Sequence, residues 1–347
     1  MSEPTAGSDG IGEQRILARR LALIPGWVAL VLTTAVTLVV DSIPLTVQLL
    51  PLIVSVLVLG LPHGAVDHLL VSRATGRPFS LEIGAAVGVV YLVVGGVYAL
   101  AWFLAPSLAF AFFIVLTWVH WGQGDRYPLR RFVGVSDQRS MAVTAQTVIV
   151  RGGMPMLVPL LAHPEQYRLV ATWLVGLFSS SGTALEAAFA PQARLALAVG
   201  FGTLVVSSLA VSYVHDDREA WLVDAGETLL LLAFFVLVPP LLAIGVYFCA
   251  WHSLRHVVRY LLLGGPPAEA IEAGRPLAAF ARFGRDAAPL SALSLVVAAA
   301  LYVTAPGAST ALEDLLALYL VFIAVLTLPH VLFATWLDHY EYARQAE

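Results

Sequence analysis

The stretch from Leu229 to His256 reads LLLLAFFVLVPPLLAIGVYFCAWHSLRH, and no charged residue interrupts it before Arg255. A membrane-spanning helix needs about 20 predominantly apolar residues. Together with residues 222–228 and 257–262 on either side, the stretch is long enough for two such helices. Pro239-Pro240 separates them, because proline removes a helix hydrogen bond and clashes with the preceding turn. The stretch therefore predicts two consecutive membrane-spanning helices, the second of which carries a histidine motif.

The remainder of the chain has the same apolar character. Of the 347 residues, 59% are hydrophobic and 12% are charged, whereas soluble domains usually carry about 25% charged residues. The mean hydropathy is +0.84. A soluble protein of this length would lack the polar side chains to cover its surface. The composition therefore excludes a soluble cytosolic enzyme, a nucleic-acid-binding protein and a disordered protein, and it predicts an all-α, polytopic membrane protein.

About ten segments, and at least eight, approach the length of a membrane span. They are roughly 26–41, 44–70, 81–104, 106–122, 141–162, 192–213, 222–238, 240–262, 287–304 and 311–337. The apolar segment 166–178 is too short to span and is expected to be interfacial or re-entrant. We expect a single integral membrane domain over 21–340, between a polar N-terminal tail (1–20) and a C-terminal tail (341–347).

The arginines predict the orientation of these helices, because basic residues favour cytoplasmic loops. All 19 basic residues are arginine. With the N-terminus inside, the cytoplasmic loops and tails contain Arg15, Arg19, Arg20, Arg73, Arg77, Arg126, Arg130, Arg131, Arg139, Arg218, Arg275, Arg282, Arg285 and Arg344. The outer loops keep chiefly Arg168 and Arg194. We therefore expect both termini in the cytoplasm and a multi-pass protein of the plasma membrane.

Five histidines fall at one depth in this topology. His63, His120, His252, His256 and His330 all lie late in spans that run from outside to inside, hence in the cytoplasmic half of the membrane. His252 and His256 are four residues apart, which places two imidazoles on one helix face. Imidazole suits Fe, Zn, Cu and Ni. The pattern predicts a buried metal site formed by His63, His120, His252 and His256.

Three further residues are candidates for the same site. Asp67 lies one turn beyond His63, where it could accept a hydrogen bond from a ligand imidazole. His68 and His330 are possible additional ligands. A lone histidine in a membrane more often makes an interhelical hydrogen bond, and this alternative stays open for His330.

Other polar and aromatic residues within the spans allow further predictions. Arg151 lies in mid-span before Gly152-Gly153-Met154-Pro155, which suggests a broken helix, and it has either a functional role or a carboxylate partner. Arg255 is expected to extend to the cytoplasmic headgroups. Five aromatic residues beside the histidine motifs either line an apolar substrate tunnel or pack between helices: Trp118, Trp121, Tyr247, Phe248 and Trp251.

The order and spacing of the histidine motifs resemble those of a known family. The run PHGAVDH (62–68), then HWG (120–122), then HSLRH (252–256) is similar to the Brp/Blh family of membrane-integral β-carotene 15,15′-dioxygenases. The resemblance covers about residues 20–340. It implies Fe(II) held by the four histidines, and cleavage of β-carotene by O₂ at its central double bond into two all-trans-retinal molecules. It also implies that the retinal supplies a microbial rhodopsin.

Two other functions remain open from the sequence. A membrane-bound carotenoid or lipid hydroxylase or desaturase usually carries more histidines in repeated HxxxH and HxxHH boxes, whereas this chain has one HxxxH and no HxxHH. A transporter with a histidine site often shows inverted repeats and paired broken helices, which we do not find in the sequence. A rhodopsin is excluded because the chain has no lysine for a Schiff base, and the single cysteine, Cys249, excludes a cysteine-based metal cluster.

Overall fold

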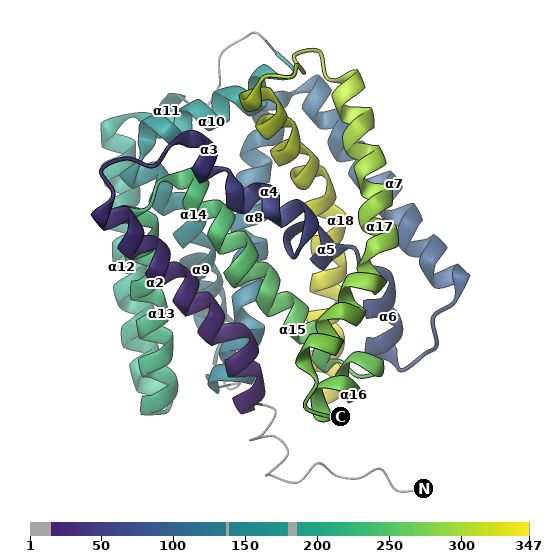
Figure 1. The fold of residues 1–347 in the computed structure, drawn as a ribbon. Helices are drawn as coiled ribbons and strands as arrows, with labels where there is room; N and C mark the ends of the chain where they lie inside the picture. The colour runs from purple at the N-terminus through teal and green to yellow at the C-terminus, as the bar shows by residue number, and fades with distance from the viewer. Residues whose placement is uncertain (1–14, 137–138, 180–185, 347) are drawn as a thin grey trace, which may run out of the picture. The chain divides into compact units, whose positions relative to one another are not determined.

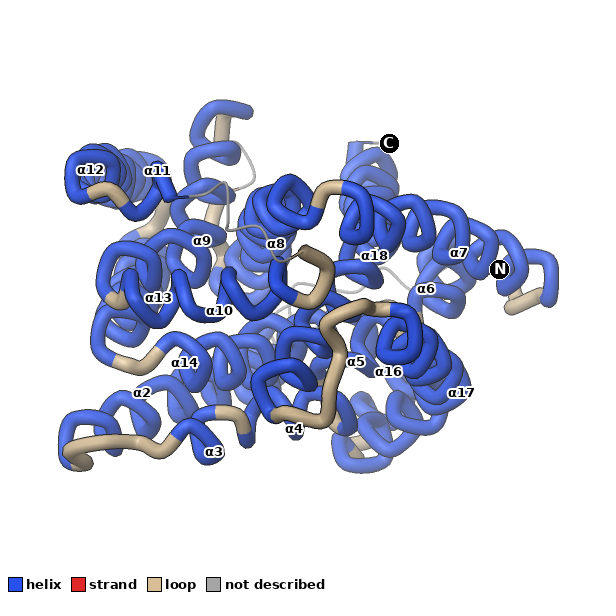
Figure 2. The backbone as a smooth tube through the Cα atoms, turned by 90° about the horizontal axis from the view of Figure 1, so that it is seen from above, coloured by secondary structure: helices blue, strands red, loops and turns tan. Residues whose placement is uncertain are grey.

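A computed structural model describes residues 15–136, 139–179 and 186–346. Within these ranges every regular element is a helix (Figure 1, Figure 2). Ten helical segments are long and apolar enough to cross a membrane. The predicted all-α fold with about ten spans is therefore confirmed, whereas the cytoplasmic placement of the termini stays a prediction.

The helices follow one another with short connections. In chain order they are η1 (Arg19–Leu23), α2 (Ile24–Val39), α3 (Leu45–Gln48), α4 (Leu50–Leu57), α5 (Gly60–Gly64), α6 (Asp67–Thr75), α7 (Leu81–Leu104), α8 (Pro106–Pro128), η2 (Leu129–Val133), α9 (Met141–Ala162), α10 (Pro164–Gly176), α11 (Glu186–Phe189), α12 (Pro191–His215), α13 (Arg218–Leu237), α14 (Pro240–Val246), η3 (Tyr247–Ser253), α15 (Leu254–Leu262), α16 (Pro266–Glu272), α17 (Pro276–Thr304) and α18 (Leu312–Ala346). The η segments are π-helical.

Three segments outside the predicted spans can now be placed. The apolar segment expected at 166–178 forms α10, whose 13 residues are too few to cross a bilayer. Of the N-terminal tail predicted for 1–20, residues 1–14 lie outside the described ranges and the remainder is helical. Helix α18 continues to Ala346, through most of the predicted C-terminal tail.

The chain divides into two compact units, and each is assembled from separate stretches of sequence. Unit 1 comprises Met1–Val54, Trp118–His163 and Arg194–Val258, and unit 2 comprises Ser55–Thr117, Pro164–Ala193 and Arg259–Glu347. The chain passes from one unit to the other five times, within helices α4, α8, α12 and α15 and at the junction of α9 and α10. Residues far apart in sequence are therefore neighbours within one unit.

In unit 1, helix α13 packs against α2 and α9. Close contacts between α8 and α9 depend on two glycines. A Cβ atom at Gly122 would collide with the main chain of Val148, and one at Gly152 would collide with the main-chain carbonyl of Trp118. Small residues at helix interfaces allow this close approach in membrane proteins.

Helix α9 runs without interruption from Met141 to Ala162, so the break predicted at Gly152-Gly153-Met154-Pro155 is wrong. The two glycines serve close packing instead, since a Cβ atom at Gly153 would also collide with the Phe201 ring. Pro155 and Pro159 lie inside the helix. Neighbouring helices make prolines tolerable within membrane-spanning helices.

In unit 2, helix α18 packs against α6, α7, α10 and α17. The apolar core of this unit includes Trp102 of α7, Leu174 of α10 and Phe322 of α18, all of them buried. Helix α18 thus provides the scaffold on which the shorter helices of the unit are positioned.

The second predicted span is interrupted close to His63. Helix α4 ends at Leu57, the single-turn helix α5 carries His63, and α6 begins at Asp67. Pro62 within α5 cannot donate a main-chain hydrogen bond, which favours such an interruption. The sequence predicted one continuous helix over 44–70, whereas the structure divides this segment into short helices.

Candidate metal centre

In unit 1, helices α8 and η3 bring two predicted ligands together. The rings of His120 and His252 meet edge to face, with centroids 4.8 Å apart and planes inclined by 71°. Both side chains are buried, as is His256 on α15. Gly124 of α8 leaves room for the His252 ring, because a Cβ atom there would lie 3.0 Å from Cε1 of that ring.

His252 belongs to a π-helical segment. Segment η3 covers Tyr247–Ser253 and is followed directly by the α-helical turns that carry His256. Such segments are rare and occur frequently at functional sites. The spacing of four residues suggested two stacked imidazoles on a regular α-helix, and this reasoning could not detect the wider turn at His252.

Four of the five aromatic candidates gather beside His252. The ring centroids of Trp121 and His252 lie 5.7 Å apart. The Phe248 ring stacks on the His252 ring, with centroids 6.3 Å apart. Tyr247 lies 5.0 Å from Trp121 and stacks on Trp251 at 6.3 Å. These rings make the surroundings of His252 apolar and bulky.

Trp118, the fifth candidate, has different neighbours. Its ring packs edge-on against Phe201, and its Nε1 donates a hydrogen bond to the main-chain oxygen of Ile149 at 2.8 Å. Its contacts are thus with α12 and α9. A tunnel lined by the five residues stays a prediction.

A buried network of charges lies next to the His252 segment in unit 1. Arg151 donates hydrogen bonds to Asp224 Oδ1 at 2.7 Å and to Glu227 Oε2 at 3.1 Å. Arg255 pairs with the same Glu227 and, at 3.1 Å, with Asp125. All five side chains are almost completely buried. Asp125 Oδ2 also lies 3.4 Å from Arg151 Nη1. The sequence suggested a carboxylate partner for Arg151, and the structure provides three.

The network fixes the helix that carries His252 and His256. Arg255 is 1% exposed, and its guanidinium lies 3.6 Å from the centroid of the Trp251 ring. Trp251 Nε1 in turn donates to Asp125 Oδ1 at 2.9 Å. The expectation that Arg255 extends to the headgroups is therefore wrong, because buried carboxylates offer it stronger partners than lipid.

Sequence reasoning missed the three carboxylates of this network. Asp224 and Glu227 lie inside an apolar segment, and buried acids in a membrane span are costly enough to indicate a function or a partner. Asp125 lies beyond residue 122, the predicted end of the fourth span. Helix α8 continues to Pro128, so Asp125 lies on the same helix as His120.

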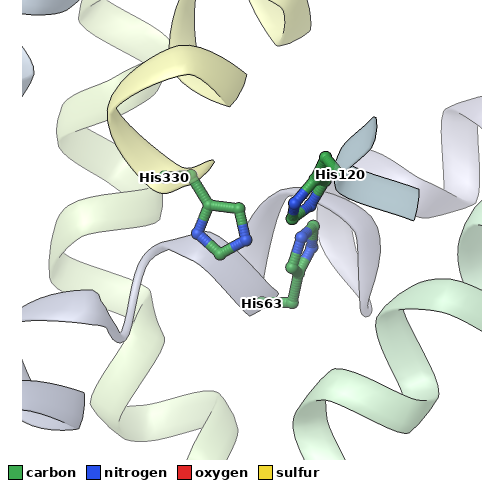
Figure 3. A group of neighbouring side chains, drawn as sticks. All are labelled: His63, His120 and His330. Carbon is green, nitrogen blue, oxygen red and sulfur yellow. The ribbon is translucent and has the colours of Figure 1, made fainter. Parts of the chain in front are cut away.

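In unit 2, His63 of α5 and His330 of α18 form a second pair of buried imidazoles (Figure 3). Their rings are perpendicular, at 89°, with centroids 4.9 Å apart. The nitrogens that they offer to a metal lie within 4.8 Å of each other. His120, also drawn in Figure 3, belongs to unit 1 and was described there.

Asp67 bonds to His330. Its Oδ2 accepts hydrogen bonds from His330 Nδ1 at 2.9 Å and from the Tyr91 hydroxyl at 2.7 Å. His68, the third additional candidate, is half-buried and packs edge-on against Phe79. Tyr91 was not identified from the sequence, since a tyrosine in an apolar helix gives no specific signal.

The unit 2 histidines have the arrangement of metal ligands. His63 Nδ1 donates to the main-chain oxygen of Gly60, and His330 Nδ1 donates to Asp67. An imidazole whose Nδ1–H is held by an oxygen presents Nε2 as a Lewis base, which is the usual arrangement of metal-ligating histidine. Buried neutral imidazoles suit Fe, Zn, Cu or Ni, so these residues fit a transition-metal ion.

Comparison with known proteins identifies the family. The family model for beta-carotene 15,15'-dioxygenase matches residues 54–338, which include the five histidines of the two units. The chain belongs to the β-carotene 15,15′-dioxygenase family. The resemblance inferred from the histidine motifs is thereby confirmed.

Two relatives from Halobacterium salinarum illustrate how far this family likeness extends. The chain is 46% identical to the protein named probable beta-carotene 15,15'-dioxygenase Blh, over 94% of each chain. It is 28% identical to probable beta-carotene 15,15'-dioxygenase Brp, over 86% of this chain and 85% of that protein. No solved structure matches the chain.

Proposed function

We propose that this membrane protein is an enzyme that cleaves β-carotene at its central double bond with O₂. The carbon–carbon double bond breaks, and each of its two carbons takes one oxygen atom of O₂. Two molecules of all-trans-retinal result, and the reaction needs no additional reductant. The observation that carries the proposal is the family match, which extends over every histidine motif.

We propose Fe(II) as the cofactor and His63, His120, His252 and His256 as its ligands. Supporting this, the four histidines follow the motif order of the family, and the predicted topology places them at one membrane depth. Each is buried. When bound, iron would supply the redox chemistry that allows O₂ to react with the polyene.

The chain's own residues have three tasks in this reaction. The histidines hold the metal without adding negative charge. Trp121 and Phe248 surround His252 with apolar rings that keep water away from the reacting groups. The spans expose large apolar side chains such as Leu92 and Val206, so a substrate that dissolves only in hydrocarbon would reach the protein from the lipid bilayer.

The chain contains no lysine, so it cannot hold the released retinal as a Schiff base. We therefore propose that the product leaves and supplies a rhodopsin, a protein that does bind retinal through lysine. A carotenoid or lipid hydroxylase, a desaturase and a histidine-site transporter are the alternatives that the experiment below separates.

The test is expression of the chain in bacterial cells that synthesise β-carotene, followed by pigment extraction and chromatography. The wild type should bleach the cells and produce retinal, whereas His252→Ala should leave them coloured. His339→Ala is the matched control, because His339 is exposed on α18 and should not affect cleavage. The purified wild type should contain iron by elemental analysis.

Other results would contradict the proposal. Unbleached cells without retinal, despite folded wild-type protein in the membrane, would rule out the cleavage activity. Hydroxylated or desaturated carotenoid would instead identify one of the other enzymes. Metal uptake by the cells with intact carotenoid would favour the transporter.

A further inference from the structure

Asp67 is a buried carboxylate that forms no ion pair with an arginine among the described residues. It is 1% exposed and lies at the start of α6 within the second span. In unit 1 each carboxylate of the buried network is paired with an arginine. In the described part of the chain, the ion-pair partner of Asp67 is His330 alone. A carboxylate buried in a membrane protein requires a compensating positive charge.

Tyr91 holds the carboxylate in place. Its hydroxyl donates to Asp67 Oδ2 at 2.7 Å, and its ring stacks in parallel on Phe333, with centroids 6.0 Å apart and planes inclined by 10°. Phe333 follows His330 by one turn on α18. The contact therefore connects α7 to the helix that carries His330.

The fixed carboxylate determines the tautomer of His330. An ionised carboxylate only accepts hydrogen bonds, so the hydrogen in the 2.9 Å contact belongs to His330 Nδ1. The Nε2 atom then carries the lone pair. A carboxylate behind an imidazole also makes that imidazole a stronger metal donor.

The position of His330 relative to His63 suits a shared ion. One ring nitrogen of each lies within 4.8 Å of one ring nitrogen of the other, and metal–imidazole bonds are about 2.1 Å long, so modest shifts of the two rings would let both bind one ion. Gly64 lies directly beside the His330 ring, since a Cβ atom at this position would be in ordinary van der Waals contact with it, 3.4 Å from Nδ1.

We propose that His330 is an additional ligand of the metal bound by His63, and that Asp67 and Tyr91 are positioning residues that orient it. The metal cation, acting through the imidazole, supplies the positive charge that the buried Asp67 carboxylate requires. This inference rests on the proposed function, since it assumes that His63 binds a metal.

The experiment uses Co(II) as a spectroscopic probe on the full chain, purified in detergent and stripped with a chelator. Visible absorption reports the ligands of Co(II), and titration gives its affinity. His330→Ala should change the absorption bands and weaken Co(II) binding, and added imidazole should restore the bands. Asp67→Asn should weaken binding about 10–100-fold, as is typical when the partner of a ligand histidine is lost. Tyr91→Phe should have a smaller effect in the same direction.

The controls separate this inference from the proposed function. His339→Ala should match the wild type. If His252→Ala abolishes Co(II) binding while His330→Ala keeps the wild-type affinity and bands, the inference fails and the proposed function stands. If the wild type binds neither Co(II) nor iron, both fail. If circular dichroism shows that His330→Ala is unfolded, the Co(II) titration of Asp67→Asn becomes the test. A wild-type Co(II) absorption spectrum and affinity in Asp67→Asn would then overturn the inference.

Discussion

Arg151 and Arg255 lie within membrane-spanning helices, where an isolated charge is expensive. Each is satisfied by carboxylates from other helices of the same unit. The arrangement resembles a buried salt bridge with shared members, so loss of one member leaves an uncompensated charge behind. The network is therefore more sensitive to truncation than an exposed ion pair.

Replacing Asp125 by alanine should lower the free energy of unfolding by about 3–5 kcal/mol, because Arg255 and Trp251 lose a buried acceptor. The control is Glu219→Ala, which removes a surface ion pair with Arg19 and should cost about 0–1 kcal/mol. Unfolding of the two variants in detergent, followed by circular dichroism, measures the difference. Equal destabilisation would show that the buried network adds nothing specific.

Sequence reasoning at this scale found the histidines and Asp67, which accepts a hydrogen bond from His330, but it did not find the carboxylates that pair with the buried arginines. A histidine in an apolar segment is conspicuous, and five of them at one predicted depth pointed to a site. The partners of Arg151 were not recognisable, because Asp224 and Glu227 lie 73 and 76 residues away in sequence. Only the packing of α9 against α13 brings them together.

Among the elements, the spans were predictable and their irregularities were not. Hydrophobicity gives the approximate position of a span but does not report where a helix bends. The interruption at α5 and the π-helical turn at η3 both lie at proposed metal ligands. The break expected in α9 is absent, because its glycines serve close packing with neighbouring helices. Glycine in a membrane helix often marks such close packing rather than a bend.

Gly152→Ala should destabilise the contact between α9 and α8. The added Cβ atom meets a main-chain carbonyl that cannot rotate away, and overpacking of this kind typically costs about 1–3 kcal/mol. Gly88→Ala in α7 is the matched control, because no atom lies within 4 Å of its Cβ position and alanine favours helix. The thermal unfolding midpoints in detergent should fall for the first variant only. A Gly152→Ala protein as stable as Gly88→Ala would refute the packing role.

The orientation of the whole molecule in the membrane was inferred from arginine positions alone. Ten spans with the N-terminus inside place the loop after α6 in the cytoplasm and the loop before α18 outside. The single cysteine, Cys249, makes this testable by labelling, because a Cys249→Ala background contains no other thiol.

In that background, Thr310→Cys should react with a membrane-impermeant maleimide in intact cells, since the residue is exposed in the loop before α18. Pro78→Cys, exposed in the loop after α6, should react only after the membrane is permeabilised. Gel-shift analysis of the labelled protein reads out both results. The reverse pattern would invert the topology, and with it the cytoplasmic depth assigned to the histidines.

Unit 1 is assembled from three separate stretches of sequence, and this has a consequence for biosynthesis. Asp125 and Arg151 are 26 residues apart, whereas Arg255 follows Asp125 by 130 residues. At about 5–20 residues per second of translation, Arg255 emerges roughly 6–26 s after Asp125. During that interval the nascent chain contains Asp125 and then Arg151 but lacks Arg255, so the ion cluster of unit 1 is incomplete. The earliest time at which the cluster can be completed is therefore set by translation, however fast the helices pack.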